Sequence, residues 1–463
     1  MHYDMVIKGG GVVSSQGSLR ADVGIVGEKI VAVGLDLEGR ETLDASGKLV
    51  LPGVLDVHNH FQLPFCGTVS ADDFESGSKA AAMGGVTTFL DFAIQAKPAS
   101  VLDAIARRRA EADEKVCVDY GLHAGITQWN DDRAREIPEI IRAGLPSFKM
   151  FMIYRSEGWQ STDADLYCAL RETAKFGGMV GVHAENDDLI TLFHHEAEKE
   201  GLTGCYAHAL TRPTVTESEA ISRAIHLAEA SEGRLYIFHM STGRAAEIVW
   251  ESQLRGIDVH AETGPHYLLL DDELFKRSDG HHFATCPPIR KPEDQEMLWQ
   301  GLAEGSIEVL ATDTCTFNSE QKAMWNGDFR KIPFGMPGIE TLLPLTYSKG
   351  VREGRISLER MVELLCENPA RLFGMWPRKG IISPGSDADI VIFDPDLAVT
   401  ISHEILATNC DYNPFDGTAV VGWPITTLVR GKIVVRDRVF CGEPGYGQFI
   451  AREPADLHAP PIA

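Results

Sequence analysis

Two histidines stand two residues apart at the end of an apolar segment. Residues 53–60 read GVLDVHNH, so His58 and His60 lie at its end. Residues i and i+2 of a β-strand point to the same face, and they lie about 7 Å apart at a rise of roughly 3.3 Å per residue. Two imidazoles at that separation can share a metal ion, although such a pair alone is also common in protein cores and on surfaces.

Lys149 lies inside a second apolar segment, SFKMFMIY at 147–154. An unpaired ammonium in such a segment is costly to desolvate. The lysine can pair with a buried carboxylate, or its side chain can extend to the edge of the sheet. A third explanation is a neutral amine that has added CO₂ to form a carbamate. A carbamate is an anion able to bridge two metals, and both desolvation and nearby cations disfavour the competing ammonium form.

Three more apolar segments carry an ionisable residue near their end, namely His183, His239 and Asp313. A lone histidine on an apolar strand is usually a structural core residue, and Asp313 can instead cap the next helix. As a set, the six residues supply four imidazoles, one carboxylate and one potential carbamate. These donors suit two borderline metal ions bridged by hydroxide, and zinc fits them best. The candidate metal ligands are therefore His58, His60, Lys149, His183, His239 and Asp313.

Eight apolar segments alternate with stretches of helical period in the middle of the chain. Apolar strands between helices predict a parallel sheet that is covered on both faces. Eight such units in about 320 residues favour a closed α/β fold, the TIM-like (β/α)₈ barrel, whose active sites lie at the carboxyl ends of the strands. The predicted strands are 53–60, 86–92, 118–126, 147–154, 179–185, 234–240, 258–264 and 308–314, and the clearest helices are 100–115, 163–176, 216–232 and 243–254.

Both ends of the chain read as short strands separated by glycine-rich turns. We predict that residues 1–52 and 381–440 form one small β-sandwich domain, and that residues 53–380 form the barrel domain. Residues 441–463 are rich in Pro and Gly and lack a regular period, so we expect a C-terminal arm that packs on a neighbouring subunit.

Composition excludes several classes of protein. Of 463 residues, 44% are hydrophobic and 24% charged, which is typical of a globular protein. The net charge of −24 disfavours nucleic-acid and anionic-membrane partners. The sequence has no run of 18 apolar residues, so it predicts no membrane span. Nine scattered cysteines without a CxxC motif favour a reducing, cytoplasmic location.

These motifs resemble those of the dihydropyrimidinase/hydantoinase branch of the cyclic amidohydrolases, nearly end to end. GVLDVHNHFQLPFCGTVSADDFESG is similar to the first metal motif of that family, and SFKMFMIY to its carboxylated-lysine strand. GVHAEN and YIFHMST resemble the third and fourth histidine motifs. ETGPHYLLL, CPPIR, TDTCTFN, DYNPFDG and ENPARLFGMWPRKGIISPGSDADIVIFDP follow the same pattern.

The resemblance implies a TIM-like barrel with a β-sandwich built from both termini, and a homotetramer. It implies two zinc ions per subunit, bridged by carboxylated Lys149 and hydroxide. His58 and His60 would bind one ion together with Asp313, and His183 and His239 would bind the other. Tyr154, five residues beyond Lys149, would donate a hydrogen bond to the substrate carbonyl.

The resulting hypothesis is a hydrolase that opens cyclic amides, either 5,6-dihydropyrimidines or 5-substituted hydantoins, to N-carbamoyl amino acids. Asp313 would transfer the proton from the attacking hydroxide to the leaving nitrogen. Allantoinase and cyclic-imide hydrolase remain open as alternatives. A non-catalytic assembly scaffold is a further alternative, which is disfavoured because all six ligand positions are filled.

Several residues near the expected substrate position depart from the family pattern. Phe334 stands where relatives often have Asn, Cys286 where Ser is common, and Thr314 where the aspartate motif reads DHC or DNC. Phe61 replaces the arginine of dihydroorotases, so that activity is disfavoured. An apolar wall for the ring substituent is predicted, with ordinary loop packing as the alternative, from Leu63, Phe65, Phe151 and Trp159.

Overall fold

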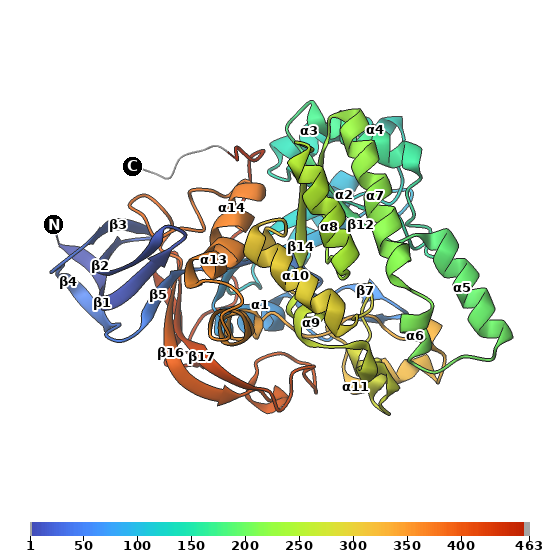
Figure 1. The fold of residues 1–463 in the computed structure, drawn as a ribbon. Helices are drawn as coiled ribbons and strands as arrows, with labels where there is room; N and C mark the ends of the chain where they lie inside the picture. The colour runs from blue at the N-terminus through green and yellow to red at the C-terminus, as the bar shows by residue number, and fades with distance from the viewer. Residues whose placement is uncertain (1, 458–463) are drawn as a thin grey trace.

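The eight apolar segments become the eight strands of one parallel sheet (Figure 1). The structure is a computed structural model that describes residues 2–457. Each strand pairs with the next along the chain, and nearly every residue in them is buried. The strands are β6 (Val54–Asn59), β9 (Val86–Ile94), β10 (Asp119–Gly125), β11 (Ser147–Phe151), β12 (Met179–His183), β13 (Arg234–Ile237), β14 (Val259–Thr263) and β15 (Val309–Leu310).

Hydrogen bonds between the first and last segments bring the sheet to a nearly closed barrel. The Thr312 amide donates to Asp56 Oδ1 at 3.0 Å, and the His60 amide donates to the Thr314 carbonyl at 2.8 Å. The prediction of a (β/α)₈ barrel is confirmed. The last strand, Val309–Leu310, is shorter than its predicted range of 308–314, and the backbone after it has a positive φ of 50° at Asp313.

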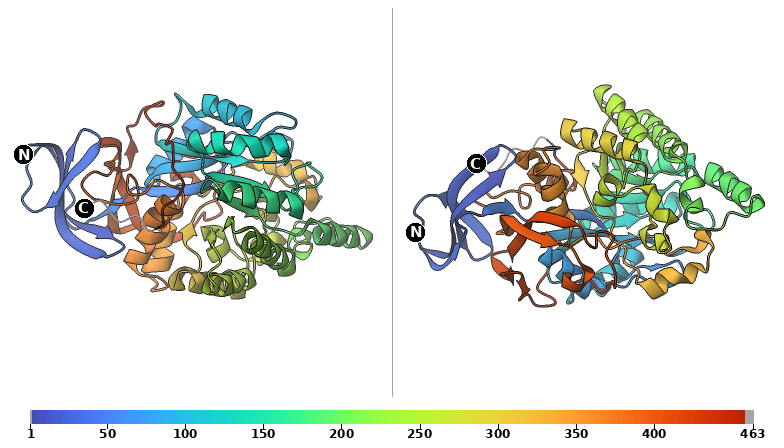
Figure 2. Two further views of the ribbon diagram at one scale, coloured as in Figure 1. Left: turned by 90° about the horizontal axis from the view of Figure 1, so that it is seen from above. Right: turned by 60° about the horizontal axis from the view of Figure 1, so that its bottom comes forward.

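Helices surround the strands of the barrel (Figure 2), and the four predicted helical segments correspond to α2, α4, α7 and α8. Capping boxes begin α2 at Ser100 and α4 at Thr162. The α-helices are α1 (Phe74–Met83), α2 (Val101–Ala112), α3 (Asp131–Arg142), α4 (Asp163–Ala174), α5 (Asp187–Lys199), α6 (Ala207–Leu210), α7 (Thr214–Ser231), α8 (Gly243–Leu254), α9 (Pro265–Leu269), α10 (Pro292–Glu304), α11 (Ser319–Lys322), α12 (Leu342–Leu345), α13 (Leu358–Val362) and α14 (Asn368–Leu372). Short 3₁₀ and π turns are η1 (Asp272–Lys276), η2 (Gly280–Phe283), η3 (Ala323–Trp325), η4 (Phe329–Lys331), η5 (Thr346–Val351), η6 (Glu363–Glu367) and η7 (His403–Ile405).

Strands from both ends of the chain form a second sheet at one end of the molecule, opposite helix α5 (Figures 1 and 2). Antiparallel pairing of β5 with β16 joins the two groups into one nine-stranded sheet. The sheet encloses its own hydrophobic core, to which Ile7, Val23, Ile392 and Leu428 contribute. Its strands are β1 (Tyr3–Ser14), β2 (Gly17–Val26), β3 (Lys29–Gly34), β4 (Gly39–Asp44), β5 (Leu49–Pro52), β16 (Ile390–Thr400), β17 (Ala419–Val429), β18 (Lys432–Arg436) and β19 (Val439–Phe440).

The described part of the C-terminal segment lies against the barrel of its own chain. The Ile450 amide donates to the Tyr120 carbonyl at 2.7 Å, and the Gln448 amide donates to Asp119 Oδ1 at 3.0 Å. Residues 458–463 lie outside the described residues. The arm onto a neighbouring subunit and the domain limits at 52, 380 and 440 stay predictions. Among the described residues, no helix combines the length and apolar character needed to cross a membrane.

Candidate metal and substrate site

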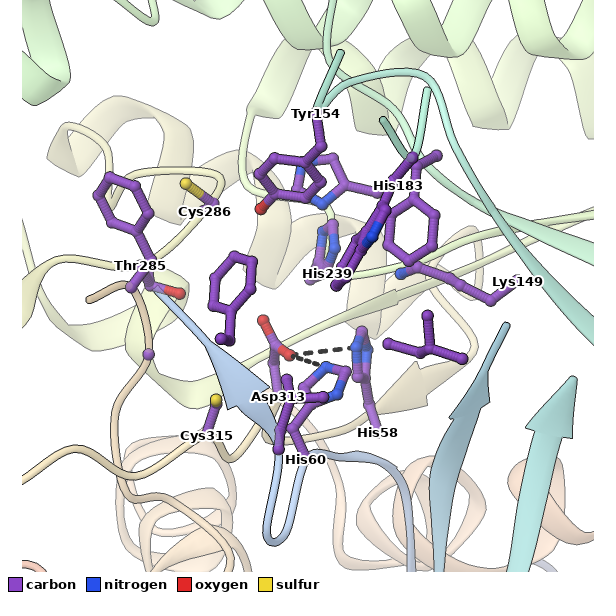
Figure 3. A pocket seen from close by; sticks show the side chains of 17 residues that line it. His58, His60, Lys149, Tyr154, His183, His239, Thr285, Cys286, Asp313 and Cys315 are labelled. Carbon is purple, nitrogen blue, oxygen red and sulfur yellow. Dashed lines mark ion pairs between the residues drawn. The ribbon is translucent and has the colours of Figure 1, made fainter. Parts of the chain in front are cut away.

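One cavity lies at the carboxyl ends of the barrel strands, and every predicted site residue lines it (Figure 3). The six candidate metal ligands come from five different strands or the residues that follow them. The cavity therefore gathers residues that are as much as 255 positions apart in the chain, since His58 and Asp313 lie together. The predicted residues that line it are His58, His60, Leu63, Phe65, Lys149, Phe151, Tyr154, Trp159, His183, His239, Cys286, Asp313 and Phe334.

His58, His60 and Asp313 form the tightest cluster in the cavity. Asp313 Oδ1 lies 3.1 Å from His58 Nε2 and 3.1 Å from His60 Nε2, as the dashed lines in Figure 3 mark. Although burial opposes ionisation, the two imidazoles hold the pKa of Asp313 below its usual range. Asp313 does not cap a helix, since Asn318 is the N-cap of α11, so the capping alternative is wrong.

His183 and His239 form a second group beside the first. His183 ends β12, His239 follows β13, and their ring centroids are 4.4 Å apart. The His239 ring lies 5.3 Å from that of His58, so the two groups adjoin. His239 has a positive φ of 39°, and such backbone conformations in non-glycine residues occur most often at functional sites.

Lys149 is buried without a charged partner. Only 2% of the residue is exposed, and Nζ lies 3.9 Å from the Phe238 ring centroid. Among residues 2–457 no carboxylate forms an ion pair with Nζ within 4.0 Å, although those of Asp313 and Glu262 attract it from farther away, and the burial of the residue excludes the edge-seeking lysine. Burial lowers the pKa of Lys149 to about 7. The neutral amine, which is the form that adds CO₂, is therefore accessible near neutral pH.

Buried carboxylates orient two of the imidazoles. Glu262 on β14 accepts a hydrogen bond from His58 Nδ1 and another from the Tyr236 hydroxyl at 2.9 Å. Glu185 Oε2 accepts from His183 Nε2 at 2.7 Å. In each ring the proton lies on the nitrogen that donates, so His58 Nε2 and His183 Nδ1 carry none. A ring nitrogen must be unprotonated to bind a metal.

The donor set fits a metal ion. His58 Nε2 is buried and has no hydrogen-bond partner among residues 2–457, although a carboxylate oxygen lies 3.1 Å away. A cation between these atoms would satisfy both the imidazole lone pair and the carboxylate charge. His58, His60 and Asp313 offer ligand atoms that all lie within 4.8 Å of one another.

Comparison with known proteins decides the family. The family model described as "Amidohydrolase family" matches residues 49–434, which is most of the chain. The chain belongs to the amidohydrolase family. It is 42% identical over 453 residues to the D-hydantoinase of Geobacillus stearothermophilus, covering 96% of both chains, and 39% identical over 464 residues to a D-phenylhydantoinase of Escherichia coli, covering 99% of both. The crystal structure of dihydropyrimidinase from Brevibacillus agri NCHU1002 superposes with a TM-score of 0.96 at 40% identity, covering 98% of this chain and 99% of that one.

Aromatic side chains make up one wall of the cavity in this amidohydrolase. The Phe65 and Trp159 rings stack with centroids 5.8 Å apart, and Phe151 lies 5.2 Å from Trp159. Tyr154 projects between them and the histidines, with its ring 5.2 Å from His183. Burial raises the pKa of the Tyr154 hydroxyl well above its usual range, so this group remains a neutral hydrogen-bond donor.

The opposite wall contains residues that sequence reasoning missed. Cys315 lies two residues beyond Asp313, and Gly335 packs so closely that a Cβ there would lie 2.3 Å from the Cys315 carbonyl oxygen. Phe334 stacks on the His208 ring at 4.6 Å, which fixes its position. The spacing from Asp313 was an available signal for Cys315, whereas nothing local pointed to His208. The additional lining residues are Ile94, Thr285, Cys315 and Gly335.

Glu185 and Glu262 were also missed, although a carboxylate within or beside a buried strand was a usable signal. Three other histidines lie elsewhere: His123 is a core residue bonded to Ser147 and the Val57 carbonyl, and His260 pairs with Asp258 and Glu308. His194 is on α5.

Replacing Glu185 with glutamine is expected to weaken metal binding by about 10- to 100-fold, the range typical of residues that orient a metal ligand. Glu185 Oε2 accepts from His183 Nε2 at 2.7 Å and from the buried Arg212 at 2.7 Å, and an amide oxygen in its place carries no negative charge to strengthen these two bonds. Equilibrium dialysis against a competing chelator measures the change. Glu229→Gln, which breaks an exposed pair with Arg255, is the matched control. Unchanged metal affinity in Glu185→Gln would refute the orienting role.

Proposed function

We propose that this amidohydrolase opens cyclic amides, namely 5-substituted hydantoins or 5,6-dihydropyrimidines, to N-carbamoyl amino acids. One observation carries the proposal. The cavity has candidate metal ligands on one side and apolar rings on the other. Relatives named D-hydantoinase and D-phenylhydantoinase, each matched over almost the whole chain, support the same substrate class.

Two zinc ions fit the donor set in this proposal. His58, His60 and Asp313 would hold one ion, and His183 and His239 the other, and carboxylated Lys149 would supply a further anionic ligand. The burial that lowers the pKa of Lys149 to about 7 supports the carbamate, since it favours the neutral amine. When bound, the ions would polarise the carbonyl and lower the pKa of water toward neutrality.

Asp313 is the proposed proton carrier. One of its oxygens faces His58 and His60, and Figure 3 draws the other pointing into the cavity. Because its pKa is held below the usual range, Asp313 is ionised and able to accept a proton from the attacking water. It would then return that proton to the ring nitrogen that leaves as the C–N bond breaks.

Tyr154 is the proposed donor to the carbonyl oxygen as negative charge develops there. Its hydroxyl lies in the cavity near Cys286 (Figure 3) and remains protonated. The positive φ of 69° at Tyr154 turns the chain so that the side chain reaches the cavity. A donor held in place before the reaction stabilises the oxyanion without reorganisation.

The apolar wall is the proposed site for the substituent of the ring. Leu63, Phe65, Phe151 and Trp159 offer aliphatic and aromatic surface to a phenyl or alkyl group. Cys286 and Phe334 line the other side, where the ring itself would lie. Neither side chain carries a charge at neutral pH, since burial raises the pKa of Cys286 to about 12, so a neutral ring is favoured there.

Tyr154→Phe is expected to lower kcat by about 100- to 1,000-fold, the usual effect of removing one oxyanion donor. The ring that packs against Phe65 and His183 is kept, so the fold and the metal content are expected to be unchanged. Steady-state kinetics with 5-phenylhydantoin and metal analysis of the same preparation measure both quantities. Tyr167→Phe on α4 is the control variant. A kcat within about twofold of the parent enzyme would rule out the donor role.

A panel of substrates tests the proposed function as a whole. Turnover of dihydrouracil, 5-phenylhydantoin, allantoin and succinimide is measured side by side on protein with known zinc content. We expect the first two to react fastest. Reaction of allantoin alone or succinimide alone would replace our substrate assignment, and zinc-free protein that stays inactive on added zinc would favour the assembly scaffold.

We also propose that the enzyme is a homotetramer of the cytoplasm. All nine cysteines are unpaired, which supports a reducing compartment. Sedimentation equilibrium measures the number of subunits, and a monomer at micromolar concentration would contradict the tetramer.

A further inference from the structure

Lys322 is a fully buried lysine that the proposed reaction does not use. It ends α11, it is 0% exposed, and its Nζ donates a hydrogen bond to the Ala284 carbonyl at 3.0 Å. Burial lowers its pKa to about 8. No carboxylate forms an ion pair with it among residues 2–457. The ionisable groups around it include the imidazoles of His281 and His282 and the thiols of Cys410, Cys315, Cys205 and Cys66.

This lysine is difficult to explain as a stabilising residue. A buried ammonium without a carboxylate partner loses hydration that one carbonyl does not replace, and apolar side chains of similar volume often serve as well or better in such places. We therefore look for the role of Lys322 in its single hydrogen bond, to the Ala284 carbonyl.

The Ala284 carbonyl is a junction between two walls of the reaction cavity. It accepts a second hydrogen bond from the Gly335 amide at 3.0 Å. Ala284 comes directly before Thr285 and Cys286, which line the cavity. Gly335 and the preceding Phe334 line it as well. Figure 3 shows Thr285 and Cys286 on the side of the cavity opposite Lys149. The lysine thus anchors the carbonyl at which the two segments that face the candidate metal ligands are bonded to each other.

Gln321, the preceding residue, reaches a third wall. Its Nε2 donates to Thr68 Oγ1 at 2.8 Å and to the Val69 carbonyl at 2.7 Å. Both acceptors belong to β8 (Thr68–Val69), which pairs with β7 (Pro64–Phe65) in a hairpin that carries Phe65 into the cavity. The short helix α11 therefore bonds two separate segments that enclose the substrate site, and one of them, at the Ala284 carbonyl, is bonded in turn to Gly335.

We propose that Lys322 is a positioning residue for substrate binding: through the Ala284 carbonyl it sets the spacing of segments 284–286 and 334–335, and hence the width of the cavity for the cyclic amide. This inference rests on the proposed function, because it concerns the same cavity. Lys322 acts on the walls of the cavity and not on the candidate metal ligands. The proposal therefore predicts a change in KM without a matching change in kcat.

Lys322→Met tests the proposal, because methionine fills similar space and removes the hydrogen bond. For 5-phenylhydantoin we expect KM to rise at least about tenfold while kcat stays within about twofold, since walls displaced by a fraction of an ångström bind the ring less well. Bound metal is expected to be unchanged, and Tm unchanged or higher. Lys175→Met, at a position where 56% of the side chain is exposed, is the control.

Two results would overturn the proposal. The first is a folded Lys322→Met protein with KM within about twofold of the parent value, and the second is a loss of kcat and metal with no change in KM. If that variant does not fold, Lys322→Gln decides in its place, since its shorter side chain cannot hold the Ala284 carbonyl at the same distance and should raise KM in the same way. A parent enzyme inactive on every cyclic amide would instead refute the proposed function, and it is measured first.

Discussion

Replacing Lys149 with alanine is expected to remove the bound metal and to lower hydantoin turnover by at least about a thousandfold, because water activation and carbonyl polarisation are lost together. The lysine is buried among the rings of Phe92, Phe151 and Phe238 with no charged partner in the described chain, and burial brings its pKa to about 7. Alanine has no nitrogen to carry a carbamate. Metal content by mass spectrometry and turnover of 5-phenylhydantoin measure the two losses.

Short carboxylic acids such as acetate and propionate are expected to restore part of both properties in Lys149→Ala. The shortened side chain leaves room for a carboxylate, which offers two oxygens as the carbamate would. Lys175→Ala, an exposed lysine paired with Glu172, controls for the loss of a positive charge. Full metal content and full activity in Lys149→Ala would refute the carbamate.

Asp313→Asn is expected to lower kcat by about 100- to 10,000-fold, the range found when a general base is removed. The amide matches the carboxylate in shape, yet it neither accepts the proton of the attacking water nor carries the charge that faces His58 and His60 at 3.1 Å. Metal loss is expected at one site only. His183 and His239 form a separate group of candidate ligands beside the cluster that contains Asp313, and that group is unchanged in the variant. Single-turnover kinetics on protein of measured metal content separates chemistry from occupancy.

The matched control is Asp279→Asn, which changes an exposed aspartate paired with Arg277. It is expected to leave kcat, KM and metal content unaltered. If Asp313→Asn with one or both metals bound kept kcat within about tenfold of the parent enzyme, another group would have to transfer the proton.

The barrel and its ligand-bearing ends could be predicted from sequence because their signals are local. A strand buried on both faces reads as a continuous apolar run, so His58, Lys149 and His183 stand out within such runs. Alternation with helices then places the ends of all strands at one mouth of the barrel. Tyr154 followed from its spacing to Lys149 only through the family resemblance.

Longer-range features were not predictable, because they depend on how distant segments pack. Glu262 binds His58 across 204 positions of sequence, and Lys322 reaches Ala284 from another loop. The positive φ of Asp313, after the end of β15, is not revealed by any periodicity of the sequence. That the two ends of the chain form one domain was predicted from their similar short strands and glycine-rich turns, whereas the pairing of β5 with β16 and its register were not.

The sequence by itself determined the barrel, the six candidate ligands and the class of chemistry, because burial imposes an apolar pattern that makes each polar exception visible. Only the tertiary structure decided which imidazole nitrogen is free, that Lys149 has no charged partner, and which side chains shape the substrate cavity. Those properties depend on distances and burial. Both are established only when β6 and the residues after β15 are bonded to each other and close the barrel.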